Sequence, residues 1–170
     1  PWGVVGEAME AVTGERFDRL VKRLVLEPLR LQGGFNPAEF SRTELANLAT
    51  LYRKRENIGS QEIWRPPEGP WYAQVDDVAN EAPVARAGPG YVPGTNGTLF
   101  GPQGGLRTSA ADLAVVMRML MAGGRFEGRA FLKKETVAAM FARQWTRDAR
   151  GAGGDTSPEE GAKDLFNAWG

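Results

Sequence analysis

Residues 100–124 (FGPQGGLRTSAADLAVVMRMLMAGG) predict a complete structural unit by themselves. Thr108 or Ser109 is a typical N-cap, and Asp112, three residues after Ser109, can answer the exposed backbone amides of the first turn. Two glycines end the stretch and supply the left-handed positions that stop a helix. Between these signals, apolar side chains recur at helical spacing: Leu113, Val116, Met117, Leu120 and Met121. The sequence therefore predicts a helix that follows a glycine-rich loop and packs by one face.

The N-terminal residues predict two short helices in succession. The first apolar stripe stops at Thr13 and Gly14 and consists of Val4, Val5, Ala8, Met9 and Val12. The second follows at once and consists of Phe17, Leu20, Val21, Leu24 and Val25. It ends at Glu27 and Pro28, because proline cannot donate to the hydrogen-bond ladder of a helix. Residues 3–31 are therefore expected to form a helical pair.

The whole chain predicts a single partial domain over residues 1–170, mostly α-helical with irregular loops. Its parts are the helical pair (3–31), an irregular insertion (32–98), a second helical part (99–145) and a loop with the start of a strand (146–170). The insertion is rich in Pro, Gly and aromatic residues and too long for an ordinary connection. Within it, residues 48–53 favour a short strand, although residues 44–52 could equally continue a helix begun near Ser41.

A further helix is predicted over residues 135–143. Its inward face is expected from three residues: Val137, Met140 and Phe141. Lys133 and Lys134 precede it where a serine or a similar cap is usual, and two cations at a helix start oppose its dipole. Either the helix begins later, or a carboxylate such as Glu135 offsets the two lysines.

Composition excludes several classes of function. Lys plus Arg (21) equals Asp plus Glu (21), so no net field favours a nucleic acid or a membrane surface. No apolar run approaches the ~20 residues that a membrane helix needs. The absence of cysteine and histidine excludes disulfides, thiol chemistry and the usual zinc ligands. We expect no metal, no cofactor, no nucleic-acid partner and no membrane segment in this chain.

Several linked segments resemble the penicillin-recognising serine hydrolases, which include class C β-lactamases, D-alanyl-D-alanine carboxypeptidases and related esterases. The run GVVGEAMEAVTGERFDRLVKRLVLEPLRL is similar to the segment that follows the second catalytic motif of that family. GPQGGLRTSAADLAVVMRMLMAGG, followed by LKKETVAAM, is similar to a later segment in the same order. DLFNAWG resembles the approach to the strand that carries the third motif. The resemblance implies part of the helical subdomain of an α+β, β-lactamase-like fold.

All three catalytic motifs of that family are absent from this sequence. The first is a serine three residues before a lysine, and no serine here has that partner. The second is Tyr-x-Asn or Ser-x-Asn, and no tyrosine or serine has an asparagine two residues later. The third is Lys-Thr-Gly or His-x-Gly, and no lysine precedes Thr-Gly. In the order of the family, these motifs would precede Pro1 or follow Gly170, so we expect an internal fragment of a longer hydrolase.

The resemblance implies acyl transfer as the chemistry of the parent chain. A serine attacks the carbonyl of an ester, a β-lactam or a D-Ala peptide, lysine and tyrosine move the proton, and backbone amides hold the oxyanion. This chain would contribute no catalytic residue and would shape the groove for the small-molecule acyl substrate. The alternative is a catalytically inactive homologue or a helical binding module. The resemblance alone suggests a periplasmic or secreted location.

Five residues are candidates for lining that groove: Gln103, Gly104, Gly105, Trp71 and Tyr72. Gly104 and Gly105 either bring backbone close to the substrate, as the corresponding loop of the family does, or form a tight turn before the helix. Gln103 either donates a hydrogen bond to an acyl substrate or braces the loop. Trp71 and Tyr72, like Trp64, flank proline-rich turns, and they either wall an apolar pocket or fasten the insertion down.

Other patterns have structural explanations. Asp76 and Asp77 are adjacent, and adjacent residues on a strand face opposite ways, so paired acid–base chemistry is not expected. Residues 96–98 (Asn-Gly-Thr) match a glycosylation acceptor, but Asn-Gly is first of all a turn former. Residues 88–90 start like a dinucleotide loop, but Pro93 replaces the glycine that such a loop requires.

Overall fold

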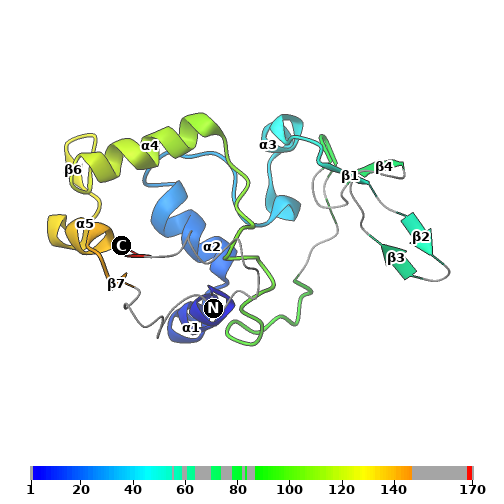
Figure 1. Ribbon diagram of the computed structural model, residues 1–170, viewed down its shortest axis with the longest axis horizontal. Helices are drawn as coiled ribbons and strands as arrows, with labels where there is room; N and C mark the ends of the chain where they lie inside the picture. The colour runs from blue at the N-terminus through cyan, green and yellow to red at the C-terminus, as the bar shows by residue number, and fades with distance from the viewer. Residues whose placement is uncertain are drawn as a thin grey trace. The chain divides into compact units, whose positions relative to one another are not determined.

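Figure 1 shows the ribbon of the computed structural model. The chain divides into two compact units, residues 1–115 and residues 116–170. It describes residues 2–54, 56–58, 61–63, 70–73, 78–81, 83, 87–146 and 168–169. Trp64, the Asp76–Asp77 pair and most of the loop predicted over residues 146–163 lie outside the described residues. None of the helices in the described ranges is long and apolar enough to cross a bilayer.

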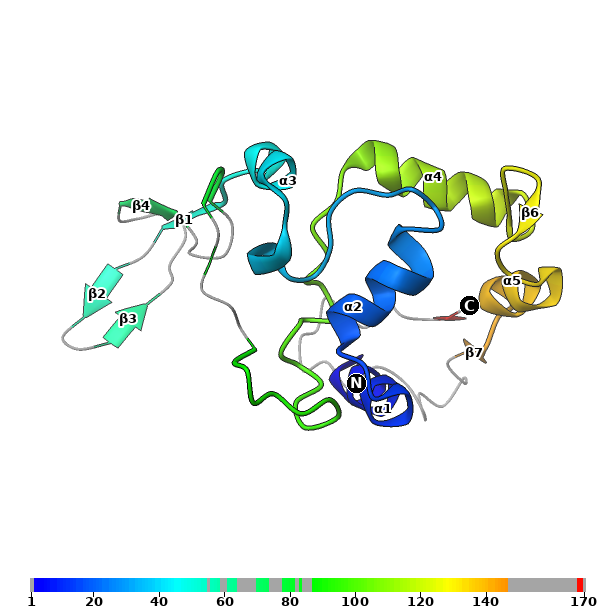
Figure 2. The same ribbon diagram turned by 180° about the vertical axis from the view of Figure 1, so that it is seen from behind.

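Two helices open the first unit, as the sequence predicts. α1 (Trp2–Thr13) ends at Gly14, whose φ of 68° lies in the left-handed region. α2 (Phe17–Val21) continues directly into a π-helical turn, η1 (Lys22–Leu26), which ends before Pro28. Both views of the ribbon show α1 and α2 as neighbours (Figures 1 and 2).

An aromatic core holds the first unit together. Phe17 and Phe35 pack edge to face with ring centroids 5.0 Å apart, and Phe100 completes the buried cluster. Tyr91 packs edge to face against Phe100 at 5.8 Å, and the guanidinium of Arg16 lies 4.9 Å from the centre of the Phe100 ring. These residues come from distant parts of the sequence. The core therefore holds the segment from Tyr91 to Phe100 against the N-terminal helices.

The region between the helical parts contains short elements. They are η2 (Pro37–Glu39), α3 (Arg42–Asn47), β1 (Tyr52–Lys54), β2 (Glu56–Ile58), β3 (Gln61–Ile63) and β4 (Trp71–Ala73). α3 ends at Asn47, so the hypothesis of a helix over residues 44–52 is wrong beyond that residue. β1 pairs antiparallel with β4, and β2 pairs antiparallel with β3. Trp71 therefore lies opposite Lys54 in the first of these ladders.

α4 (Ala110–Met121) begins in the first unit and continues into the second, which holds the remaining elements. They are β5 (Arg125–Phe126), β6 (Arg129–Ala130), α5 (Lys134–Phe141), β7 (Trp145–Thr146) and β8 (Ala168–Trp169). β5 pairs with β6, and β7 pairs with β8. α4 ends as predicted, because Gly123 and Gly124 have φ values of 64° and 86°.

The inward face predicted for α5 is only partly correct. Val137 is buried, whereas Met140 and Phe141 are exposed. A helix of eight residues has little more than two turns, so one buried residue is enough to define the face that packs. The helix begins at Lys134 with Lys133 as N-cap and no side-chain cap bond, and Glu135 stands in its first turn. The two lysines therefore do lie at the helix start.

α1 buries its small and acidic face and exposes its apolar stripe. Gly6 and Glu10 are buried, whereas Val4 and Val12 are 72% and 87% exposed. The loop over residues 91–102 lies against the buried face so closely that a side chain at Gly97 would collide with the backbone of α1. The exposed stripe lines an apolar depression together with residues of α2 and η1.

Candidate functional site

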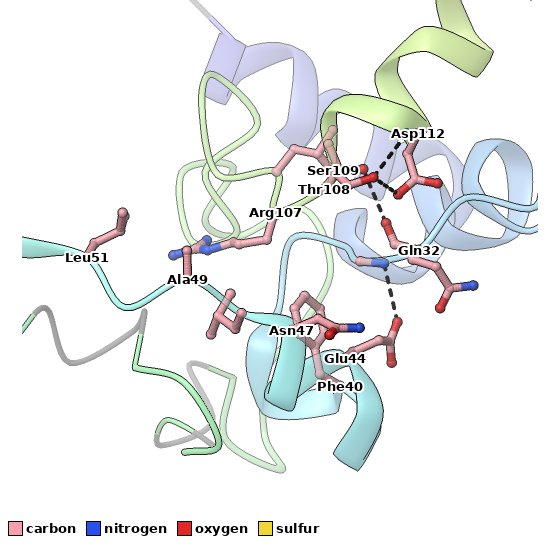
Figure 3. Close-up of a pocket in the computed structure, with 13 residues that line it drawn as sticks. Gln32, Phe40, Glu44, Asn47, Ala49, Leu51, Arg107, Thr108, Ser109 and Asp112 are labelled. Atoms are coloured by element: carbon pink, nitrogen blue, oxygen red, sulfur yellow. Dashed lines mark hydrogen bonds between the residues drawn. The ribbon is translucent and has the colours of Figure 1, made fainter.

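A pocket of about 450 Å³ lies in the first unit (Figure 3). One wall is the segment around Gly33 together with α3, and the other is the loop that leads into α4. The apolar lining comes from Phe40, Leu48, Ala49, Leu51 and Leu106. The polar lining comes from Gln32, Glu44, Asn47, Arg107, Thr108, Ser109 and Asp112.

A pair of backbone hydrogen bonds, which we call the Gly34–Arg107 bridge, joins the two walls. Gly34 and Arg107 each donate an N–H to the carbonyl of the other, both at 2.9 Å. The hydroxyl of Thr108 adds a bond to the carbonyl of Gln32 at 3.2 Å. Gly33 has a φ of 99°, and a side chain there would collide with the carbonyl of Arg107. Glycine at this position is therefore what allows the two walls to approach each other.

Glu44 fastens one wall to α3. Its Oε2 accepts the N–H of Ser41 at 2.8 Å, and its Oε1 accepts the N–H of Gly33 at 3.3 Å. The Ser41 hydroxyl accepts the N–H of Glu44 at 3.2 Å, which completes a capping box. Burial alone would raise the pKa of Glu44, but the bonds from Ser41 and Gly33 and the charge of Lys22 outweigh it and lower the pKa below its ordinary 4.5. Glu44 therefore lines the pocket as a carboxylate.

Ser109 and Asp112 form the start of α4 at the opposite wall. The Ser109 hydroxyl accepts the N–H of Asp112 at 3.1 Å, which confirms Ser109 as N-cap. It also donates to Oδ2 of Asp112 at 2.7 Å, so the carboxylate pairs with the capping hydroxyl. Both functional groups therefore take part in capping the start of α4.

Arg107 brings the guanidinium group to the pocket. Its Nη1 donates to the carbonyl of Gly105 at 2.7 Å. In Figure 3 its side chain points toward Ala49 and Leu51 and away from Glu44 and Asp112. Positive and negative groups thus line different parts of one pocket.

A second polar contact, which we call the Glu10 anchor, fixes the loop over residues 91–102 to α1. Glu10 is 1% exposed, and its carboxylate accepts the N–H of Phe17 at 2.7 Å, the hydroxyl of Tyr91 at 2.6 Å and the N–H of Gly94 at 2.9 Å. Burial, and then the bond to Glu10, raises the pKa of Tyr91 to about 12. Tyr91 is therefore a protonated structural donor at neutral pH and does not suit the role of a catalytic base.

Two further acidic residues of the first unit, Asp18 and Glu39, form ion pairs. Asp18 pairs with Arg16 and accepts a bond from the amide of Asn36 at 3.1 Å. Glu39 pairs with Arg16 and Arg19, both at 2.9 Å. Among the described residues, no group of three or more His, Cys, Asp or Glu is placed to hold a metal ion.

Comparison with known families decides the relationship of the chain. A family model described as Beta-lactamase matches residues 2–168. The chain belongs to the Beta-lactamase family. This confirms the resemblance to the penicillin-recognising serine hydrolases and gives the chain a β-lactamase-like fold. No curated protein matches the chain.

Membership in the Beta-lactamase family indicates serine hydrolase chemistry in general and small-molecule substrates. The five residues predicted to line the substrate groove of this family member do not line the pocket described above. Gly104 and Gly105 both donate their N–H groups to the carbonyl of Gly101, at 3.0 and 2.6 Å. Their amides therefore close a tight turn, and Gln103 lies exposed within it.

The two aromatic candidates of this Beta-lactamase family member lie on β4. Trp71 is 64% exposed, and the ammonium group of Lys54 lies 5.1 Å from the centre of its ring. Tyr72 is half-buried and pairs in register with Arg53 of β1. The ladder thus presents Trp71 to solvent beside a cation.

Reasoning from the sequence missed Glu44, Asn47 and Arg107, which carry no catalytic pattern. Two signals could have found part of this site. Ser41 and Glu44 have the spacing of a capping box, and the consecutive glycines at 33 and 34 are typical of a close backbone approach. The partner of that approach, Arg107, is distant in sequence and leaves no local pattern.

Proposed function

We propose that this chain is the groove-forming part of a serine hydrolase that acts through an acyl-enzyme on an ester, a β-lactam or a D-Ala peptide. The match of the family model to residues 2–168 carries the proposal. The absence of the three catalytic motifs from the sequence supports a division in which the nucleophile and its bases come from outside residues 1–170. In this proposal, residues 1–170 form a single partial domain, a mostly helical portion of the α+β fold.

The turn over residues 101–105 supports a role in shaping the groove. Gly104 is exposed, and a Cβ atom added there would have nothing within 4 Å. At Gly105 the same atom would lie 2.8 Å from the carbonyls of Gly101 and Phe100. Packing among the described residues therefore requires glycine at 105 but not at 104. We propose that a substrate approaches the backbone at Gly104, with Gln103, Trp71 and Tyr72 along the same groove.

Reaction with a fluorophosphonate that labels active serines tests the hydrolase chemistry. The full-length gene product and the 170-residue chain are treated in parallel. We expect labelling of the long form and none of the short form, because the short form lacks the motif serine. Labelling of the short form would refute the division of roles.

Two glycine variants test the groove in the full-length gene product. Gly104→Ala is expected to keep the melting temperature and lower kcat/KM for an ester or β-lactam reporter by about tenfold, because binding geometry tolerates little displacement. Gly105→Ala is the matched control and is expected to lower the melting temperature, because its methyl group meets two carbonyls. Unchanged kcat/KM for Gly104→Ala would contradict the close approach of substrate.

A catalytically inactive homologue, or a helical binding module, is the second candidate. It shares with the first candidate the absence of the three motifs from residues 1–170. A folded full-length product that reacts with neither the fluorophosphonate nor a β-lactam reporter would support it over the hydrolase.

A further inference from the structure

Asn96 is the only asparagine of the sequence that precedes a glycine. The backbone nitrogen of a following residue can displace the amide nitrogen of an asparagine side chain, and glycine leaves that nucleophile unshielded because it has no Cβ. Asn96 is exposed, and its Nδ2 donates to none of the residues that the structure describes. The leaving group of such a displacement can therefore pass directly into solvent.

The carboxamide oxygen of Asn96 is held by two donors of one residue. Thr98 donates its backbone N–H to Oδ1 at 3.2 Å and its hydroxyl to the same atom at 2.9 Å. Attack on the carboxamide carbon places negative charge on this oxygen, and two donors aimed at it stabilise that charge. The backbone bond also closes a turn that contains both the carboxamide carbon and the nitrogen of Gly97, so the two reacting atoms stay within one turn.

Glu7 brings a base to the nucleophile. Its Oε2 accepts the N–H of Gly97 at 3.5 Å. A carboxylate in this position can take the proton in the transition state, and catalytic hydrogen bonds are often long before the reaction begins. The backbone of Gly97 lies so close to α1 that an added Cβ would lie 1.9 Å from the carbonyl oxygen of Gly3. This packing keeps Gly97 beside Glu7.

We propose that Asn96 is a modification site, which converts without an enzyme to aspartate and isoaspartate. Glu7 takes the proton of the Gly97 N–H while that nitrogen bonds to Cγ of Asn96. The bond from Cγ to Nδ2 then breaks, the nitrogen leaves as ammonia with the proton from Glu7, and a cyclic imide remains. Water from the solvent opens the imide at either carbonyl, so one water is consumed and one ammonia is released without oxidation or reduction. The site contains no groove residue and does not depend on the proposed hydrolysis.

The position of Asn96 gives the modification a structural consequence. The loop is fixed on one side by Gly94 in the Glu10 anchor and on the other by Phe100 in the aromatic core. Isoaspartate adds a carbon atom to the main chain between these two points, and the imide lacks the N–H that bonds to Glu7. The modification therefore loosens a loop that is held at both ends.

Storage of the folded full-length protein at neutral pH in heavy-oxygen water, followed by peptide mass spectrometry, tests the proposal. Opening of the imide introduces a solvent oxygen, and an isoaspartyl methyltransferase distinguishes isoaspartate from aspartate. We expect both products at Asn96, formed at least as fast as in the urea-unfolded protein, because unfolding removes Glu7 from Gly97. A slower reaction in the folded protein would show that the fold protects Asn96 and would overturn the proposal.

Two variants with matched controls test the roles of Thr98 and Glu7. Thr98→Val keeps the backbone N–H but loses the hydroxyl, and it is expected to slow the release of ammonia about tenfold. Thr95→Val is its control, since that hydroxyl bonds to the carbonyl of Val92 in the same loop. Glu7→Gln is also expected to slow the reaction about tenfold, whereas Glu135→Gln, at an exposed position of α5, should not change it. A test variant that reacts as fast as its control would overturn the role assigned to that residue.

Discussion

The Glu10 anchor and the Gly34–Arg107 bridge have the same structural role but use different hydrogen-bonding groups. Both hold a distant loop against the N-terminal half of the first unit: Tyr91 is 81 residues from Glu10, and Thr108 is 76 residues from Gln32. The anchor uses a fully buried carboxylate with three donors, whereas the bridge uses two backbone bonds beside a half-buried carboxylate. Glu10 is almost fully buried and does not line the pocket, whereas the bridge borders it.

The difference shows how the cost of burial decides where a site can form. A buried carboxylate is costly unless hydrogen bonds compensate for the lost water, so the donors to Glu10 must lie close around it. A hydrogen bond between backbone groups contributes only about 1 kcal/mol net and does not require buried surroundings. The bridge can therefore stand beside open, solvated space, which is where ligand-binding side chains remain accessible.

Removal of the anchor carboxylate is expected to have the largest effect. Glu10→Leu removes the acceptor of the N–H groups of Phe17 and Gly94 and the nearer of the two acceptors of the Tyr91 hydroxyl. It should lower the free energy of unfolding by about 3–5 kcal/mol. Urea unfolding measures the change. Glu7→Gln is the control, because Glu7 is exposed and makes a single long bond of 3.5 Å to Gly97. A Glu10→Leu protein as stable as Glu7→Gln would contradict the role of the anchor.

Alanine at Gly33 should break the bridge with an intermediate effect. The left-handed φ alone costs a non-glycine residue about 1–2 kcal/mol, and the collision with Arg107 adds about 1 kcal/mol or more. Gly14→Ala separates the two causes, since Gly14 has a φ of 68° and nothing within 4 Å of an added Cβ. Amide hydrogen exchange at Arg107 should accelerate only in Gly33→Ala. Equal losses of stability in the two variants would exclude the collision.

The two contacts should also weaken at opposite ends of the pH scale, with the smallest effects. The pKa of Tyr91 is raised to about 12 from its ordinary 10.0, so its contribution is complete below pH 10 and is lost as pH rises toward 12. The absorbance of tyrosinate follows this ionisation, and Tyr91→Phe should remove the alkaline loss of stability that it causes. An unchanged alkaline limb in Tyr91→Phe would contradict this assignment.

The stability contributed by Glu44, beside the Gly34–Arg107 bridge, should decrease in acid. The pKa of Glu44 is lowered below 4.5, so its stabilisation is present above that pH and is lost as pH falls through the lowered value. Urea unfolding between pH 6 and pH 3 should show a shallower acid dependence in Glu44→Gln than in the unaltered chain. Identical acid dependence in the two proteins would show that Glu44 does not contribute.

Local signals in the sequence predicted the helix ends well. Gly14 ends a helix and Ser109 caps one, as predicted, because a cap depends only on residues within one turn. The burial of Glu10 and the exposure of Val12 and Phe141 could not be predicted in this way, because they depend on which distant segment covers a face. The aromatic pair of Phe17 and Phe35 had the same non-local origin.

The candidate site was less predictable than the fold. The groove residues were inferred from a resemblance to the family, and they stay a prediction. The pocket itself depends on the backbone bridge between Arg107 and Gly34, which neither residue type predicts. Of its lining, Thr108, Ser109 and Asp112 were expected to matter, and for their role in the helix start.

The long sequence separation of the two contacts has a consequence for length variation. The Glu10 anchor, the Gly34–Arg107 bridge and the bond from Gly97 to Glu7 close loops of about 73 to 90 residues. The entropy of closing a loop grows only with the logarithm of its length, so even a doubling costs about 0.6 kcal/mol. The stretch between α3 and Tyr91 can therefore gain or lose several residues with little penalty to the helices on either side.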